Sequence, residues 1–345
     1  MIYEWAVIGA GPAGIAAVGK LLDQGISSAE ILWIDLAFKV GDFGARWANV
    51  PSNTKVDLFN RFLQTVKSFE YLSAEKNFPL YHAEKNKTCY LSLMVEPLQW
   101  VTNKLKEKVQ TIEDQAETLT LNNRSWRIQL KKSECRAKNV ILATGADPKN
   151  LAISTVPIIP LQDAMDAGRI KQHIQNSETI AVFGSSHSAI LALRNLVENG
   201  AKRILNFYRS PLLYAIYLED AILFDDTGLK GPTAEWAHDF IDGKLPASLE
   251  RIYSTEENVE HYLPQCDKVV YAIGFERRQL PVVEGVGHLN YIEECGIIAP
   301  GLFGFGIAYP EAKENFIGRK EYRVGLWKFM DYLQRVLPIW LKYPA

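Results

Sequence analysis

Two glycine-rich turns in the sequence have the residue types that bind dinucleotide phosphates, and the first spans residues 9–14. Gly9 allows a tight turn after a strand, Gly11 lets the backbone approach a pyrophosphate, and Gly14 lets the next helix pack closely on a sheet. The N-terminus of that helix stabilises phosphate charge with its free N–H groups. Asp35 follows after ~20 residues, where a carboxylate accepts hydrogen bonds from a ribose. These residues predict a dinucleotide site, and the alternative is a glycine-rich turn that serves packing alone.

The second turn, at residues 184–189, departs from this spacing at two positions. Ser186 takes the place of the middle glycine, where its hydroxyl can donate to a phosphate oxygen, and an alanine takes the third place, which the motif tolerates. The position of the acidic residue holds Ser210, preceded by Arg209. A guanidinium there favours a 2'-phosphate and therefore NADP over NAD, whereas the alternative for Arg209 is an ordinary surface cation. His187, within the turn, either contacts the cofactor or helps to cap the helix.

Each turn is expected to lie between a strand and a helix that is followed by a second strand. The predicted ranges are 3–8, 15–24 and 30–35 for the first strand, helix and strand, and 178–183, 190–199 and 203–208 for the second set. Two further buried strands, at 138–142 and 268–271, end at Ala143-Thr144-Gly145 and at Ala272-Ile273-Gly274. The repeat predicts an α/β fold with two Rossmann-like domains, and a hydride relay in which FAD is held at the first site and NAD(P)H visits the second.

The composition excludes several other classes of protein. Of the 345 residues, 48% are hydrophobic, which is normal for a globular chain and excludes a disordered one. The net charge of −2 provides no basic field for nucleic acid. The four cysteines lie at positions 89, 135, 266 and 295. Their spacing fits neither a disulfide framework nor a set of metal ligands, so we predict no metal site. We expect the reducing cytoplasm as the compartment. No apolar run predicts a membrane span, and the N-terminus predicts no signal peptide.

Patterns outside the repeat predict a helix at 98–109, a hairpin at 117–130 and a helix at 323–333. Residues 39–92 are expected to form loops with short helices. We expect the aromatic helix at 323–333 to pack against the FAD-binding domain or against a second copy of the chain, rather than on a membrane surface. The oligomeric state stays open, with a homodimer among the alternatives.

The paired turns and the two strand exits resemble the two-dinucleotide-binding flavoproteins, the pyridine nucleotide-disulfide oxidoreductase-like superfamily that includes thioredoxin reductases and flavin-containing monooxygenases. In that superfamily the NADP domain is inserted in a split FAD domain. The resemblance implies an FAD-binding domain from residues 1–152 and 283–345, and an NAD(P)H-binding domain from residues 153–282. Thioredoxin reductases carry a CxxC pair that this sequence lacks, so an internal dithiol relay is not expected.

Several local stretches are similar to flavin-containing monooxygenases and N-hydroxylases: Gly44-Ala45-Arg46-Trp47, Ser52-Asn53-Thr54-Lys55, Tyr208-Arg209-Ser210-Pro211 and Tyr271-Ala272-Ile273-Gly274-Phe275. The resemblance implies that Asn53 lies beside the flavin and the nicotinamide. Trp47 either covers the flavin or is a core aromatic residue, and the alternative for Asn53 is a turn residue. Many relatives place an aspartate after the glycine that aligns with Gly306, where this chain has Ile307, so we expect a backbone contact with FAD there.

The predicted function is that of an FAD-dependent NADPH oxidoreductase that oxygenates a small nucleophilic substrate, an amine or a sulfide. One alternative is a reductase acting on a disulfide, a quinone or a protein partner, and another is a flavin-binding redox sensor without catalysis. Asn53 and Trp47 are the predicted catalytic residues. The residues predicted to bind FAD and NADP(H) are Gly9, Gly11, Pro12, Ala13, Gly14, Asp35, Arg46, Trp47, Ala143, Thr144, Gly145, Gly184, Ser185, Ser186, His187, Ser188, Ala189, Arg209, Ser210, Ala272, Gly274 and Gly306.

Overall fold

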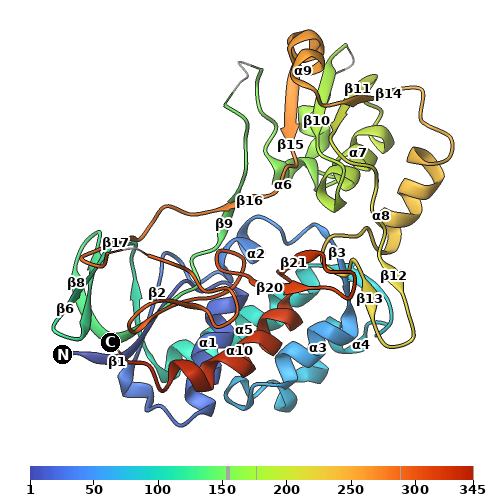
Figure 1. Ribbon diagram of the computed structural model, residues 1–345. Helices are drawn as coiled ribbons and strands as arrows, with labels where there is room; N and C mark the ends of the chain where they lie inside the picture. Colours follow the sequence, from blue (N-terminus) through green and yellow to red (C-terminus); the bar gives the residue numbers. More distant parts are fainter. Residues whose placement is uncertain (153–155, 176, 288, 345) are drawn as a thin grey trace. The chain divides into compact units, whose positions relative to one another are not determined.

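The computed structural model describes residues 1–152, 156–175, 177–287 and 289–344 (Figure 1). The chain divides into two compact units. The first unit consists of Met1–Ala146, Arg277–Glu314 and Lys320–Ala345, and the second of Asp147–Glu276 and Asn315–Arg319. Each unit has its own sheet and its own apolar core.

A parallel sheet forms the centre of the first unit. Its strands, in spatial order, are β5 (Gln110–Glu113), β2 (Ile31–Asp35), β1 (Tyr3–Ile8), β8 (Glu134–Leu142) and β19 (Leu302–Gly304). Because these strands run in the same direction, their carboxyl ends meet at one edge of the sheet. Hydrogen bonds link the exits across that edge, from Gly9 N to Ile34 O at 2.8 Å and from Ala143 N to Ile8 O at 2.9 Å. The residues that follow the strands therefore lie close together.

An antiparallel hairpin extends this sheet on the side of β8. It comprises β6 (Ala116–Asn122) and β7 (Ser125–Leu130), and β7 pairs with the first half of β8. The two residues of the turn, Asn123 and Arg124, both have positive φ, as the tight hairpin turn of this twist requires. The hairpin predicted at 117–130 is confirmed. Short strands complete the sheet, with β17 (Val282–Glu284) beside β6 and β18 (Ile297–Ala299) beside β19.

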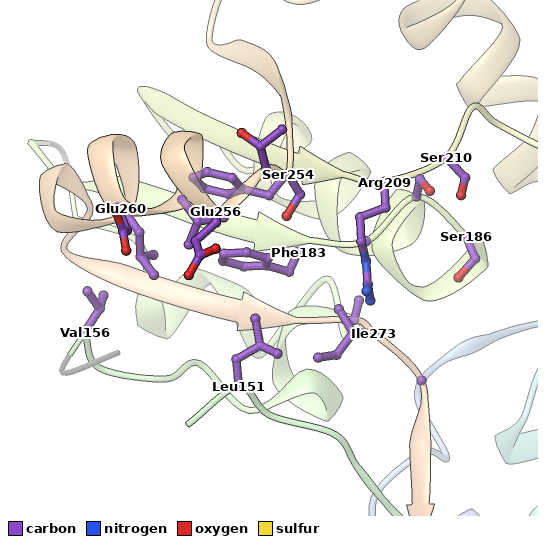
Figure 2. A pocket seen from close by; sticks show the side chains of 18 of the residues that line it. Leu151, Val156, Phe183, Ser186, Arg209, Ser210, Ser254, Glu256, Glu260 and Ile273 are labelled. Atoms are coloured by element: carbon purple, nitrogen blue, oxygen red, sulfur yellow. The ribbon is translucent and has the colours of Figure 1, made fainter. Parts of the chain in front are cut away.

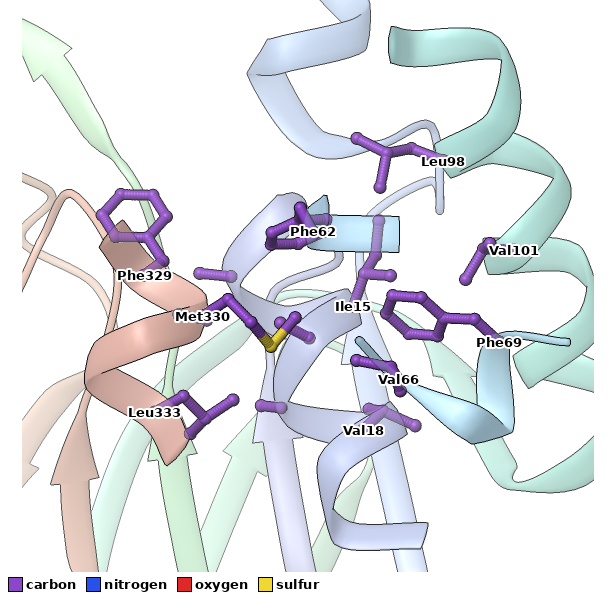
Figure 3. Packing of buried hydrophobic residues seen from close by; sticks show 14 of the residues in the cluster. Ile15, Val18, Phe62, Val66, Phe69, Leu98, Val101, Phe329, Met330 and Leu333 are labelled. Atoms are coloured by element: carbon purple, nitrogen blue, oxygen red, sulfur yellow. The ribbon is translucent and has the colours of Figure 1, made fainter. Parts of the chain in front are cut away.

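Helices cover the first sheet and bury α1 (Pro12–Asp23) among them. Figure 3 shows Ile15 and Val18 of α1 among side chains from α3 (Val56–Gln64), α5 (Ser92–Lys108) and α10 (Leu326–Trp340). The remaining short helices of this part are α2 (Gly41–Ala45) and α4 (Pro79–His82). Helix α1 begins three residues earlier than predicted, because Pro12 suits the first position of a helix, where its missing N–H has no partner to lose.

The C-terminal helix α10 packs in the first unit, as one of the two predicted alternatives states. Its predicted end at residue 333 was too early, since the helix continues through Pro338 to Trp340. Val336, Leu337 and Trp340 are buried, and the Trp340 ring stacks on Phe303 with ring centroids 4.9 Å apart. This packing stabilises the last turn of the helix beyond Pro338, which has no backbone N–H to donate.

The second unit repeats the design with four parallel strands. Their spatial order is β14 (Leu249–Tyr253), β11 (Arg203–Tyr208), β10 (Thr179–Phe183) and β15 (Lys268–Tyr271). Helix α7 (His187–Glu198) joins β10 to β11, and α9 (Glu256–Tyr262) joins β14 to β15. Between β11 and β14 lie the small hairpin of β12 (Ile216–Tyr217) and β13 (Ile222–Leu223) and the helix α8 (Gly231–Trp236). The predicted α/β fold with two Rossmann-like units is confirmed.

The described residues also bear on membrane-spanning helices and metal sites. Among them, no helix is both long enough and apolar enough to cross a membrane. The same part of the chain contains no group of three or more His, Cys, Asp or Glu side chains that could hold a metal ion.

Candidate functional site

The first glycine turn connects β1 to α1, and its three glycines have different surroundings. A Cβ atom on Gly9 would lie 2.2 Å from the Ala143 carbonyl oxygen, and one on Gly14 would lie 1.9 Å from the Gly9 carbonyl oxygen. These two positions therefore exclude any side chain. A Cβ on Gly11 would have no neighbour within 4 Å among the described residues, its two chain neighbours aside. Gly11 is also the N-cap of α1 and offers no capping side chain, so the open space beside it fits a diphosphate at the helix N-terminus.

Asp35 lies at the end of β2 and is hydrogen-bonded to the turn. Its Oδ2 accepts a hydrogen bond from Ala10 N at 2.7 Å, and its Oδ1 accepts from Ala37 N at 2.9 Å and from Phe38 N at 2.8 Å. An ionised carboxylate has about four lone-pair sites, so a ribose hydroxyl can still be accommodated. The predicted ribose ligand thus lies at the turn, and it also connects that turn to the loop after β2.

Two later segments of the chain meet the first turn at the same edge. The strand exit at Ala143-Thr144-Gly145 packs on Gly9, as the close approach of the Ala143 oxygen shows. Gly306, after β19, lies against α1, because a Cβ there would be 2.6 Å from the Ala13 Cβ. The fold therefore brings together residues that were predicted to contact one cofactor.

The structure adds Arg278 to this edge, a residue that the motifs do not identify. Its Nη1 donates to the Thr144 carbonyl oxygen at 3.2 Å, and its Nη2 contacts the Asp42 carboxylate. Asp42 belongs to α2 and also pairs with Arg46, with 3.4 Å between its Oδ1 and the Arg46 Nε. Helix α2 in turn touches the glycine turn, since a Cβ on Gly41 would lie 2.9 Å from the Gly11 Cα. In the sequence, Arg278 stands out only as a charged residue shortly after the second strand exit, which ends at Gly274.

The two residues predicted to be catalytic follow α2 along the chain. Trp47 is half-buried, and its backbone N donates to the Asp42 carbonyl oxygen at 3.1 Å. Asn53 is exposed in the short strand β3 (Pro51–Lys55), which pairs with β4 (Thr88–Tyr90). The pairing of β3 with β4 is irregular between Pro51 and Lys55, which flank Asn53, so its interpretation as a turn residue stays an alternative. The catalytic roles of both residues stay predictions.

The second glycine turn connects β10 to α7. Gly184 has a φ of +125°, and a Cβ there would lie 2.4 Å from the Ala272 carbonyl oxygen, so glycine is required at this position. Ala189 is buried in the first turns of α7, and it occupies the third position of the motif without displacing the strand. Ser186 is the N-cap of α7, but its side chain makes no capping hydrogen bond and is exposed. Its hydroxyl therefore lies at the opening of the site.

A cavity of about 1060 Å³ lies beside this turn, within the second unit (Figure 2). This volume is at the upper end of the range for cofactor sites. The predicted residues that line it are Gly184, Ser185, Ser186, Arg209, Ser210, Ala272 and Gly274. In Figure 2 the Arg209 side chain extends into the cavity, with Ser186 and Ser210 at the same end. The carboxylates of Glu256 and Glu260, from α9, line the other end and were not predicted.

His187 is the first residue of α7 and is electrostatically unusual. Its Nδ1 is buried and has no hydrogen-bond partner in the part of the chain that the structure describes. Burial, together with the charge of Lys230, lowers the pKa of His187 to about 4, so its imidazole is neutral at physiological pH. Among the described residues that line the cavity, neither His187 nor Ser188 is included. Their contact with a cofactor stays a prediction.

Comparisons with known proteins agree with this geometry. The family model for pyridine nucleotide-disulphide oxidoreductases matches residues 3–205. The monooxygenase AgnR1 of Paecilomyces divaricatus is 33% identical over 387 aligned residues, which cover 97% of each chain.

Two solved structures share the fold over 99% of both chains. The bacillithiol disulfide reductase Bdr of Staphylococcus aureus superposes with a TM-score of 0.67 at 14% identity, and a flavin-containing monooxygenase of Stenotrophomonas maltophilia with 0.65 at 14% identity. The family match covers both glycine turns, and the relative aligns along nearly the whole chain. The chain therefore belongs to the pyridine nucleotide-disulphide oxidoreductase family and is a flavin-dependent oxidoreductase with FAD and NAD(P)H as its cofactors.

Proposed function

We propose that the protein is an NADPH-oxidising flavin monooxygenase that oxygenates a small nucleophilic substrate, an amine or a sulfide. The observation that carries this proposal is the alignment with a monooxygenase over 97% of both chains. Two features of the structure support it, the two separate dinucleotide sites and the environment of the cysteines.

The first unit is proposed to bind FAD and the second NADPH. The two crossings between the units, after Ala146 and after Glu276, lie a few residues before the boundaries predicted at 152/153 and 282/283. The open space at Gly11 and the uncapped start of α1 suit the FAD diphosphate. Asp35 would accept from the adenosine ribose, and Arg278 would place a positive charge near the strand exits. Bound FAD would supply electron transfer to oxygen, while Trp47 and Asn53 would bind and orient the reacting groups.

The proposed preference for NADPH depends on Arg209. Its guanidinium enters the cavity from the end of β11, beside Ser210, where the sequence has no carboxylate to repel a 2'-phosphate. A guanidinium–phosphate contact is charge-assisted and geometrically specific. Ser186 and the N-terminus of α7 would bind the diphosphate at the same end of the cavity.

The cysteines argue against the alternative of a disulfide reductase. All four are free, and burial raises the pKa of Cys89, Cys135 and Cys266 to about 11. A nucleophilic thiol in a dithiol relay needs a lowered pKa, because the thiolate is the reactive form. These three thiols are therefore poor candidates for exchange with a disulfide substrate.

The proposal is tested by measuring which products the enzyme forms from the oxygen that it consumes. The holoenzyme is reduced with NADPH without oxygen and then mixed with oxygen, with and without thioanisole and cadaverine as sulfide and amine probes. A monooxygenase forms one oxygenated product and one water for each oxygen molecule and each NADPH consumed, and flavin reoxidation is delayed while NADP⁺ is present. Immediate reoxidation with one hydrogen peroxide per oxygen and no product would indicate a reductase. A flavin that NADPH does not reduce would indicate the redox sensor.

A glycine variant tests the FAD site independently. We expect Gly11→Val to fold but to be purified without yellow colour, since its side chain would fill the space left for the diphosphate and its Cβ would lie more than 4 Å from the described protein atoms outside its chain neighbours. Gly14→Val would instead clash with the backbone of Gly9 and lose stability. A yellow Gly11→Val protein contradicts the diphosphate assignment.

A further inference from the structure

A fully buried asparagine lies directly behind the second glycine turn. Asn206, in β11, is 0% exposed. Its Nδ2 donates to the carbonyl oxygens of Val182, at 3.0 Å, and of Gly184, at 2.9 Å. The Gly184 N–H donates in turn to the Phe207 carbonyl oxygen at 2.9 Å. Both polar groups of Gly184 are thus attached to β11.

Holding the Gly184 carbonyl oxygen also directs the next amide. The Gly184 C=O and the Ser185 N–H belong to one planar trans peptide, so they point in opposite directions. Because Asn206 fixes the oxygen on the side of β11, the Ser185 N–H points away from β11. Ser185 lines the cavity that we assign to the nicotinamide cofactor, so this N–H becomes a donor for the diphosphate.

Arg251 determines which way the Asn206 amide faces. It lies opposite Asn206 in the parallel pairing of β14 with β11, and its Nε donates to the Asn206 Oδ1 at 3.1 Å. Rotating the amide by half a turn would place its oxygen against two carbonyl oxygens and its NH₂ against a guanidinium. Only one orientation therefore satisfies all three contacts.

The same arginine also contacts the segment that carries Arg209. Its Cζ lies 4.2 Å from the ring centroid of Tyr208, which directly precedes Arg209. This is a cation–π distance. The Arg251 Nη2 is buried and has no hydrogen-bond partner among the described residues, so the Nε contact and the Tyr208 ring are what orient this guanidinium.

Neither residue is among those that line the cavity. Successive side chains of a strand point to opposite faces, and Phe207 lines the cavity whereas Asn206 faces the other way. We propose that Asn206 and Arg251 are positioning residues for NADPH: Asn206 aims the turn at the diphosphate, and Arg251 couples that turn to the Arg209 segment. This inference rests on the proposed function of the second unit.

The test measures cofactor affinity in the holoenzyme. Flavin reduction without oxygen is followed at increasing NADPH and NADH, which yields an apparent Kd and a limiting rate constant for each. We expect Asn206→Leu to raise the Kd of both cofactors about tenfold, because the diphosphate is common to both, with a limiting rate within about twofold of wild type and FAD retained. Arg209→Ala should differ from Asn206→Leu, because it should weaken the binding of NADPH and not that of NADH.

A second variant carries the test if Asn206→Leu does not fold. Asn206→Asp has the same size and keeps the acceptor for Arg251, but it has no donors for the two carbonyl oxygens. We expect the same rise in both Kd values. Arg251→Met keeps the aliphatic stem and removes the Nε donor, and it should raise the Kd of NADPH more than that of NADH, since it also releases Tyr208.

The matched control is Asn195→Leu. Asn195 is a buried asparagine of α7, 4% exposed, whose Nδ2 donates to the Ala164 carbonyl oxygen at 3.0 Å, away from the turn. The Asn195→Leu variant should have a lower free energy of unfolding but an unchanged affinity for both cofactors. Unchanged Kd values in both Asn206 variants, or an equal rise in Asn195→Leu, would overturn the positioning role. A wild-type flavin that neither cofactor reduces would contradict the proposed function instead.

Discussion

The Asp35 carboxylate and the Ala10 backbone N–H are joined by a 2.7 Å hydrogen bond that links the end of β2 to the first glycine turn. Two more backbone amides, those of Ala37 and Phe38, donate to the same carboxylate. A side chain predicted as a ribose ligand is therefore also part of the framework that shapes its own site. The two functions can be separated by measuring stability in the absence of the cofactor.

We expect Asp35→Ala to destabilise the FAD-free protein by about 3 kcal/mol, since three hydrogen bonds to a charged acceptor are lost. Urea unfolding of the apoprotein measures this. The control is Asp57→Ala, which removes a half-buried carboxylate paired with the exposed Arg61 within α3 and should cost less than about 1 kcal/mol. If Asp35→Ala loses FAD affinity without losing apoprotein stability, the carboxylate acts on the ribose alone.

We expect Arg209→Ala to raise the Kd of NADPH about thirtyfold and to leave the Kd of NADH within about twofold, because the contact with the 2'-phosphate is charge-assisted. Titration of the oxidised enzyme with both cofactors measures the difference. Arg203→Ala is the control, since Arg203 lies at the other end of β11 and is exposed beside Glu250. Equal effects on both cofactors would contradict the assignment of the 2'-phosphate site.

We expect Arg278→Ala to weaken FAD binding about tenfold, because it removes a guanidinium beside Thr144 and Gly145 at the edge where the strands of the first unit end. The change is measured from the rise in FAD fluorescence as the cofactor dissociates on dilution. Arg127→Ala, at an exposed position of β7, is the control. A variant with normal FAD retention but a less stable apoprotein would show that Arg278 serves only to hold α2.

We expect the His187 imidazole to make stability depend on pH. Its pKa is about 4 in the folded state, below the ordinary value of about 6.5, so the unfolded chain binds its proton first. The contribution is fully present above about pH 6.5 and is lost as the pH falls towards 4. Urea unfolding should therefore show wild type losing more stability than His187→Gln over this interval. Parallel pH profiles would mean that the imidazole is more accessible than its burial beside Lys230 indicates.

The two strand–helix–strand repeats were predictable because their signals are local. The apolar strands, the glycine spacing and the helix that follows each turn are contiguous in the chain, and the structure places β1, α1 and β2, and β10, α7 and β11, within a few residues of the predicted ranges. Errors occurred at helix ends such as that of α10, where buried packing of Trp340 outweighs the local effect of Pro338.

Only the tertiary structure brings Arg278 to the Thr144 carbonyl oxygen, Asn206 to the Gly184 carbonyl oxygen and Arg251 to Asn206. The sequence by itself determined the fold class, the two turns and the position of Arg209, because spacing within one strand–turn–helix segment constrains the backbone directly. It did not determine which distant side chains hold those turns in place, because such contacts depend on strand register and on packing between segments far apart in the chain.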